Sequence, residues 1–153
     1  MNVWLTLHLV GVLFMVGNVI TAAFWKIRAD LTGKPSIIHH TVRNVMIADY
    51  AFTIPGLVLI ITSGAVMAGN NGVSLLGFNW LTLSLILFAM TGLIWLAIFI
   101  PLQNRMIRHS HECMKTGAIT TEYRLASRQW AIYGVAATLL PIVILYLMVM
   151  KGF

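Results

Sequence analysis

The chain has 153 residues, of which 59% are hydrophobic and only 9% are charged. Soluble domains carry about 25% charged residues, so this composition excludes an ordinary water-exposed surface. The formal net charge is +6. The basic residues lie beside hydrophobic stretches, where membrane topology and anionic lipid account for them, and we therefore expect no nucleic-acid partner.

Four apolar stretches follow one another along the chain, and each is long enough to cross the hydrocarbon core as a helix of about 20 residues. They cover approximately residues 3–25, 45–68, 80–102 and 129–150. The expected fold class is all-α, a polytopic four-helix bundle that forms a single transmembrane domain over residues 1–153. Pro55, Pro101 and Pro141 lie within or at the ends of these spans, where each could kink a helix.

The links between the spans differ in charge. The link from Gly69 to Asn79 is short, turn-rich and uncharged, so we expect it to join the second and third helices as an antiparallel hairpin. The other two links hold every Lys and Arg except Lys151. Because Lys and Arg accumulate in cytoplasmic loops, we expect these basic loops inside the cell and both termini on the outer, periplasmic side of the inner membrane.

Two spans place polar and small residues at alternating steps of three and four, which is typical of one helix face. On the first span these residues are His8, Gly11, Met15, Asn18, Ala22 and Trp25. On the second they are Asp49, Thr53, Gly56, Ile60, Ser63 and Met67. Polar groups are costly in lipid and small residues let helices approach closely, so both faces are expected to point into the bundle.

His8 is the only histidine within a predicted span. An ionisable residue inside the membrane suggests a functional site, and imidazole is a common axial ligand of haem iron. The structural alternative is a hydrogen bond from His8 to a neighbouring helix. If His8 binds iron, Met67 or Met148 is the expected second axial ligand, or the iron has His8 alone.

Asp49 lies about one turn inside the cytoplasmic end of the second span, where an unpaired carboxylate is costly. We therefore expect a cationic partner, with Lys26, Arg28 and Arg105 as candidates. An ion pair that fixes the helix ends is the structural interpretation. Proton transfer, or binding of an anionic or quinone-like head group, is the functional one.

Several metal-binding residue types lie in the basic links. They are His39, His40, His109, His111 and Cys113. The chain contains no Cys-x-x-Cys or His-Glu-x-x-His pattern, so we expect solvated side chains at the membrane surface rather than a metal site.

Sequence motifs spread over nearly the whole chain are similar to those of a known family. They include Leu7-His8, Ala22-Ala23-Phe24-Trp25, Ala48-Asp49, Phe52-Thr53-Ile54-Pro55, Trp80, Trp95, Arg105 and Trp130. On these residues the chain resembles the bacterial predicted integral membrane proteins of domain-of-unknown-function family 2269, which implies a four-helix membrane fold. That family is more distantly similar to the haem-binding membrane protoporphyrinogen oxidase and to copper-resistance protein D type permeases, and His8 is the residue that carries over.

Three functions are expected from these features. The leading hypothesis is a bundle that binds haem b or a porphyrin through His8 and exchanges electrons with a quinone or a redox partner. The second is a small transporter or ion-handling protein, in which Asp49, Asn18 and the opposing basic residues form a polar path. The third is a non-catalytic membrane subunit whose small-residue faces bind another protein or a second copy, as a homo-oligomer.

Overall fold

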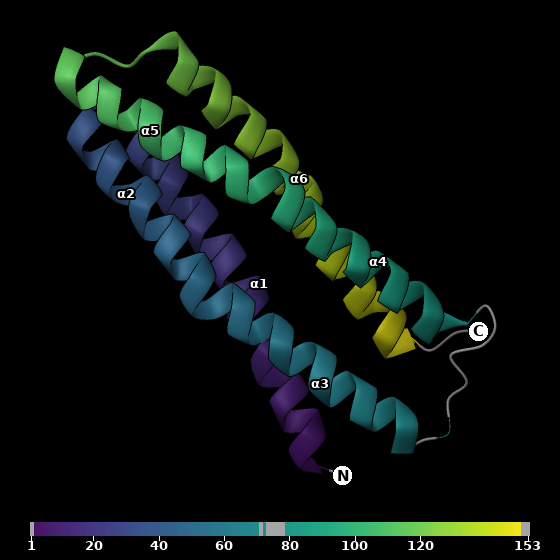
Figure 1. The fold of residues 1–153 in the computed structure, drawn as a ribbon. Coiled ribbons are helices and arrows are strands. Elements are labelled where there is room, and N and C mark those ends of the chain that lie inside the picture. Colours follow the sequence, from purple (N-terminus) through teal and green to yellow (C-terminus); the bar gives the residue numbers. More distant parts are fainter. Residues whose placement is uncertain (1, 71, 73–78, 151–153) are drawn as a thin grey trace.

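The computed structural model of the protein describes residues 2–70, 72 and 79–150. Within these ranges the helices are α1 (Asn2–Leu31), α2 (Pro35–Ala48), α3 (Ile54–Asn70), α4 (Trp80–Ile94), α5 (Ile100–Thr116) and α6 (Thr121–Met150). A π-helical turn over Asp49–Thr53 joins α2 to α3, and a second over Trp95–Phe99 joins α4 to α5. The described residues thus form four long helices (Figure 1), each long and apolar enough to cross a membrane. The expected all-α four-helix membrane fold is confirmed.

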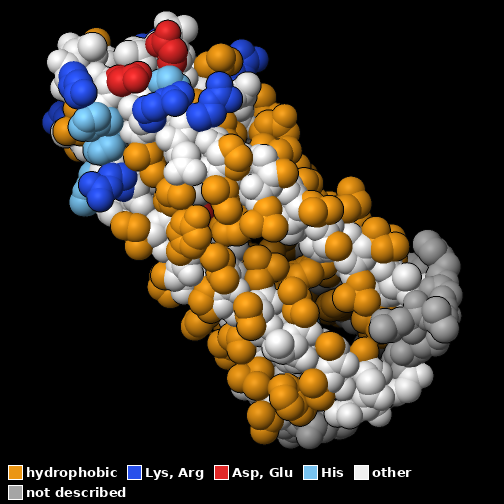
Figure 2. Space-filling view, in the orientation of Figure 1, with side chains coloured by type: hydrophobic (Ala, Val, Ile, Leu, Met, Phe, Trp, Pro, Cys, Tyr) orange, Lys and Arg blue, Asp and Glu red, His pale blue; other side chains and the backbone are white. Residues whose placement is uncertain are grey.

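The outside of the bundle is apolar over most of its length. Large side chains that point away from the other helices include Leu13, Leu93 and Leu139, which are 70%, 65% and 55% exposed. Figure 2 shows hydrophobic atoms along the length of the molecule, whereas Lys, Arg and His gather at one end. An apolar surface of this extent is suited to contact with lipid acyl chains rather than water.

Both chain ends lie at the same end of the bundle. The start of α1 and the end of α6 lie near the end of α3 and the start of α4 (Figure 1). The connections over residues 32–34 and 117–120 lie at the opposite end, where the charged side chains gather (Figure 2). A chain that crosses the bundle an even number of times must have both of its ends on the same side. That the charged end faces the cytoplasm remains a prediction from the distribution of Lys and Arg.

The loops at the charged end are shorter than the sequence suggested. The helices continue through most of both basic links, and only residues 32–34 and 117–120 remain as connections. The reason is amphipathic spacing within the links, because α2 buries three apolar residues at helical intervals. These are Ile38, Val42 and Val45. Polar residues of α2 such as His40 and Arg43 therefore occupy the outer face of a helix rather than a loop.

Among the described residues, the most extensive contact between two helices joins α1 to α3. Where they cross, Gly11 faces Gly56, and a Cβ atom built on either glycine would lie 2.8 Å from the carbonyl oxygen of the other. No side chain fits at this point, so the two backbones approach as they do in small-residue interfaces of membrane helices. The crossing sets the register in which the polar residues of α1 and α3 lie opposite one another.

The helices α3 and α4 are consecutive in the chain but lie apart within the described residues. α3 packs on α1, α4 packs on α6, and the two long helices meet instead at the charged end, through α2 and α5. The second and third spans are antiparallel, as expected, but they are not packed against each other near their link. Most of that link, predicted as a turn, lies outside the described residues. The separation leaves a cavity between the two helix pairs.

The long helix made of α2 and α3, and that made of α4 and α5, each contain a π-helical turn shortly before a proline. The turns cover Asp49–Thr53 and Trp95–Phe99, and Pro55 and Pro101 follow two residues later. A proline has no N–H to bond the carbonyl four residues earlier, and its ring crowds that carbonyl, so a wider turn relieves the clash. The predicted effect of these two prolines on helix geometry thus takes the form of a π-helical turn.

We predict that Gly11→Ala lowers the free energy of unfolding by about 1–3 kcal/mol, the usual cost of overpacking. The new methyl group would lie 2.8 Å from the backbone oxygen of Gly56, which cannot move without shifting α3. Thermal unfolding in detergent, followed by circular dichroism, measures the change. Gly17→Ala is the matched control, because a Cβ atom at Gly17 meets nothing within 4 Å. Equal stability of the two variants would contradict the tight crossing.

Candidate functional site

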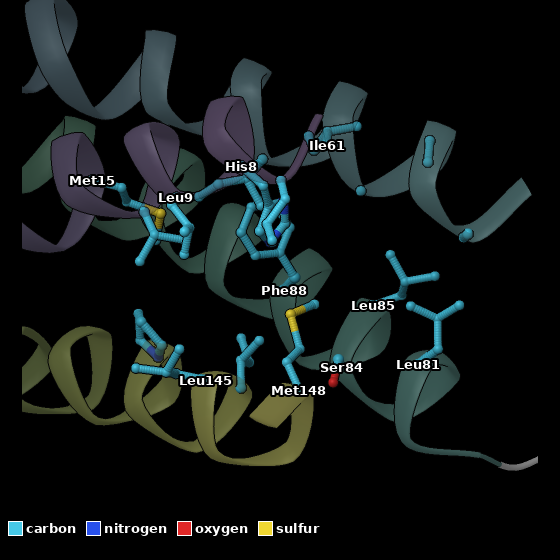
Figure 3. Close-up of a pocket in the computed structure, with 18 of the residues that line it drawn as sticks. His8, Leu9, Met15, Ile61, Leu81, Ser84, Leu85, Phe88, Leu145 and Met148 are labelled. Atoms are coloured by element: carbon cyan, nitrogen blue, oxygen red, sulfur yellow. The ribbon is translucent and has the colours of Figure 1, made fainter. Parts of the chain in front are cut away.

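A cavity of about 450 Å³ lies between the helix pairs α1–α3 and α4–α6. Figure 3 shows side chains converging on it from all four helices, and Figure 2 shows the surface hollowed between them. Among the described residues that line it, His8 and Ser84 alone have polar side chains, and none is charged. The volume falls within the roughly 300–1,000 Å³ that is typical of small-molecule and cofactor sites.

His8 is fixed against α3 by a hydrogen bond. Its Nδ1 lies 3.0 Å from Oγ of Ser63, and both side chains are buried. The Ser63 hydroxyl donates to the backbone carbonyl of Leu59, so its oxygen accepts from Nδ1–H of His8. This assigns the ring proton to Nδ1 and leaves the lone pair on Nε2. Metal-binding histidines are oriented in this way, by a partner on the nitrogen that does not bind the metal.

A glycine leaves room for this imidazole. A Cβ atom built on Gly64 would lie 3.5 Å from Cε1 of His8, in ordinary van der Waals contact. Longer side chains at this position would displace the ring from Ser63. The small-residue pattern of α3 thus serves the site as well as the packing of the helices.

Methionine is the other candidate ligand type, and only one of the two predicted methionines, Met148 and Met67, lines the cavity. Met148 on α6 lines the cavity, and Figure 3 shows it reaching in from the side of α6 toward His8. Met67 is not among the lining residues. Met15 on α1 lines the same cavity and is 5% exposed. Its place on the inward face of α1 was predicted, whereas its contact with the cavity was not.

A second polar centre surrounds Asp49, where α1, the first π-helical turn and α5 meet. Asn18 donates from Nδ2 to Oδ1 of Asp49 at 2.7 Å, and Thr53 donates to the same oxygen at 3.2 Å. Gln103 donates from Nε2 to Oδ2 at 2.5 Å. All four side chains are buried. Both oxygens of the carboxyl group therefore accept hydrogen bonds from neutral donors on three segments of the chain.

The predicted cationic partner of Asp49 is not found. Within the described part of the chain, Asp49 forms no ion pair with Lys26, Arg28 or Arg105. Lys26 lies eight residues beyond Asn18 on α1, about 12 Å along the helix axis, and is therefore too far from the carboxyl group. Asn18, which was expected to share a polar path with Asp49, is hydrogen-bonded to it. Neutral amide and hydroxyl groups take the place of the expected charge.

Lys26 belongs to a third polar centre, which ties α1 to α6. Its Nζ lies 2.6 Å from Oδ2 of Asp30 and also contacts Oγ of Ser127. Tyr123 and Ser127 donate to Asp30 at 2.6 and 2.8 Å. Lys26 is 2% exposed, whereas Trp25, predicted on the inward face, is 62% exposed. The buried face of α1 thus shifts by one residue here, because Lys26 finds a partner four residues on and the Trp25 ring tolerates lipid.

The histidines of the basic links lie on α2 and α5. Nδ1 of His39 is 2.8 Å from Oγ of Ser110, and the rings of His39 and His111 are 5.4 Å apart. Nδ1 of His109 is 3.0 Å from a carboxylate oxygen of Glu112. Among the residues that the structure describes, no three His, Cys, Asp or Glu side chains gather as a metal site would require.

We predict that Gln103→Leu lowers the free energy of unfolding by about 1–3 kcal/mol, because it deprives a buried carboxyl oxygen of its donor. Asn104→Leu is the matched control, since Asn104 is the next residue on α5 and is exposed. Thermal unfolding in the same detergent compares the two variants. A Gln103→Leu protein as stable as Asn104→Leu would mean that the Asp49 carboxyl group does not depend on this bond.

Comparison with curated proteins finds no match, and neither does comparison with solved structures. A family model matches residues 2–152, and its description is that of a predicted integral membrane protein. The match extends over all four long helices, with the His8 cavity and the polar centres included. The chain therefore belongs to the predicted integral membrane protein family DUF2269.

Proposed function

We propose that this protein binds haem b or a related porphyrin in the cavity beside His8 and takes part in electron transfer in the inner membrane. The observation that carries the proposal is the state of His8, which lines an apolar cavity while Ser63 holds its Nδ1. Its Nε2 is therefore free of the ring proton and can serve as a ligand. Haem iron, when bound, supplies one-electron transfer.

The lining residues fit such a group in their chemistry. His8 offers an imidazole nitrogen, and Met148 and Met15 offer thioether sulfurs in the same cavity. These are two of the axial ligand types that proteins use for haem iron. The apolar walls keep water away from the ligand atoms, which is one of the ways in which a protein sets a redox potential. Because no described lining residue is charged, the carboxylates of haem b would lie outside the apolar lining.

The location of the cavity favours a partner that is itself in the membrane. The cavity lies along the hydrophobic length of the bundle, away from the charged end (Figure 2). A quinone, or another membrane protein with a redox centre, can approach this part of the molecule without leaving the bilayer. Either one would exchange electrons with the group held by His8.

Optical spectra of the purified protein, oxidised and then reduced with dithionite, test the proposal. We expect a Soret band and reduced α and β bands in the wild-type protein and their loss in His8→Ala. Ser63→Ala should lower haem affinity about 10–100-fold, the usual effect of removing the partner of a histidine ligand. His40→Ala is the matched control, because His40 lies on α2 and is exposed.

Two results would rule the haem function out. One is a colourless wild-type protein from cells that are replete with haem. The other is a haem spectrum that His8→Ala leaves unchanged in shape and intensity. Circular dichroism of each variant shows that the fold is retained.

One observation favours a second function, the movement of protons or small cations. The carboxyl group of Asp49 is buried in the bundle and its hydrogen-bond donors include Asn18, Thr53, Gln103 and Trp95, all of them neutral. No fixed positive charge in this centre competes with a proton or a cation for the carboxylate. An acidic side chain in this situation is characteristic of ion and proton pathways in membrane proteins.

Flux into proteoliposomes tests this second function, with a pH-sensitive dye inside the vesicles. We expect the wild-type protein to carry protons down an imposed gradient. Asp49→Asn should reduce the rate of proton flux to that of empty vesicles, because the amide side chain of asparagine does not titrate. Glu112→Gln removes an exposed acid instead and should leave the rate unchanged. A wild-type rate equal to that of empty vesicles would exclude the function.

A further inference from the structure

A second cavity, of about 510 Å³, forms a groove between α1 and α2 toward the charged end. Its lining differs from that of the His8 cavity, because it contains several polar side chains and one cationic side chain, that of Arg28. Trp25 and Ile37 supply part of its apolar wall. The groove therefore joins a charged group to an apolar surface at the level where the lipid-covered part of the molecule ends.

Three polar side chains of this groove have no partner within the described chain. Arg28, Thr41 and Asn44 line it, and no hydrogen bond or ion pair joins any of them to another described residue. Lys26 makes a clear contrast, because it lies two residues away on α1 and is fully engaged with Asp30. Arg28 and Asn44 are exposed and Thr41 is half-buried, so the three side chains are available to a ligand from outside the chain.

The positive charge of Arg28 favours an anion as the ligand of the groove. A guanidinium group presents paired N–H donors that match the oxygens of a phosphate, and neutral amide and hydroxyl groups such as those of Asn44 and Thr41 add hydrogen bonds. The acid nearest to Arg28 in sequence is Asp30, which is already engaged by Lys26, Tyr123 and Ser127. No described acidic side chain forms an ion pair with Arg28.

Exposed apolar side chains beside the groove favour an amphiphilic ligand over a free anion. Phe24 and Ile47 each adjoin a lining residue in sequence, and they are 56% and 60% exposed. The Phe24 ring packs edge-on against the ring of the lining residue Trp25, with centroids 5.2 Å apart, so exposed apolar surface adjoins the groove. Basic pockets between membrane helices are known to hold anionic lipid head groups.

We propose that this groove binds the phosphate head group of an anionic phospholipid. Arg28 contacts the phosphate, Thr41 and Asn44 donate or accept hydrogen bonds around it, and the acyl chains lie along the apolar surface beside Phe24 and Ile47. The site is separate from the His8 cavity and does not depend on the function proposed for it. A lipid held here bridges α1 and α2 where their own connection is only residues 32–34.

Native mass spectrometry of the full chain in detergent tests the site, with phosphatidylglycerol and phosphatidylcholine of the same acyl chains as probes. We expect the wild-type protein to retain phosphatidylglycerol in preference to phosphatidylcholine. Arg28→Gln should lower the affinity for phosphatidylglycerol about tenfold, the effect of losing a charge-assisted hydrogen bond of about 1.4 kcal/mol. Asn44→Leu, which leaves the charge unchanged, should lower it in the same direction.

Arg108→Gln is the matched control, because Arg108 is exposed on α5 and does not line the groove, yet its loss changes the net charge equally. It should leave lipid retention unchanged. Equal losses in Arg28→Gln and Arg108→Gln would overturn the proposal, since they would reflect general attraction to charge. Displacement of the lipid by inorganic phosphate at the same concentration would also overturn it, because the groove would then recognise the free anion.

Discussion

Hydrocarbon offers no hydrogen bonds, and this constraint organises the protein around its first helix. Three buried polar side chains of α1 find partners on other parts of the bundle: His8 on α3, Asn18 on the first π-helical turn, and Lys26 on α6. Each of these contacts joins α1 to another part of the bundle. The close crossing of α1 and α3 holds the register in which two of them form. A shift of either helix by one residue would turn buried polar groups toward lipid.

The two ends of the bundle differ in a way that suits them to different tasks. At the charged end α1, α2, α5 and α6 pack together, and buried side chains such as Met106 and Tyr123 form a continuous core. At the other end the pairs α1–α3 and α4–α6 separate around the cavity that His8 lines. The packed end keeps the helices in place, so that the open end can keep a space between them without collapsing. The Asp49 centre lies between the two regions.

Much of this arrangement follows from the spacing of residues in the sequence, and some of it does not. The inward faces of α1 and the second long helix were predicted from steps of three and four, and His8, Asn18 and Asp49 are buried as that pattern requires. The prediction failed at Trp25, because periodicity alone cannot tell which neighbouring residue will find a partner on another helix. Gln103 was missed as a donor to Asp49 for a related reason. Gln103 follows a proline at the end of a predicted span, where nothing local signals its partner 54 positions away.

The separation of α3 and α4 affects the apparent affinity that would be measured for a ligand of the cavity. Figure 2 shows this gap as a hollow on the apolar side of the molecule, between the two helix pairs that line the cavity. A molecule dissolved in the bilayer would enter laterally, and its relevant concentration would be its mole fraction in the lipid. Apparent affinity would then fall as more lipid is added at a fixed amount of ligand and protein. Titrations with a ligand of this kind would therefore depend on the lipid-to-protein ratio as well as on the total ligand concentration.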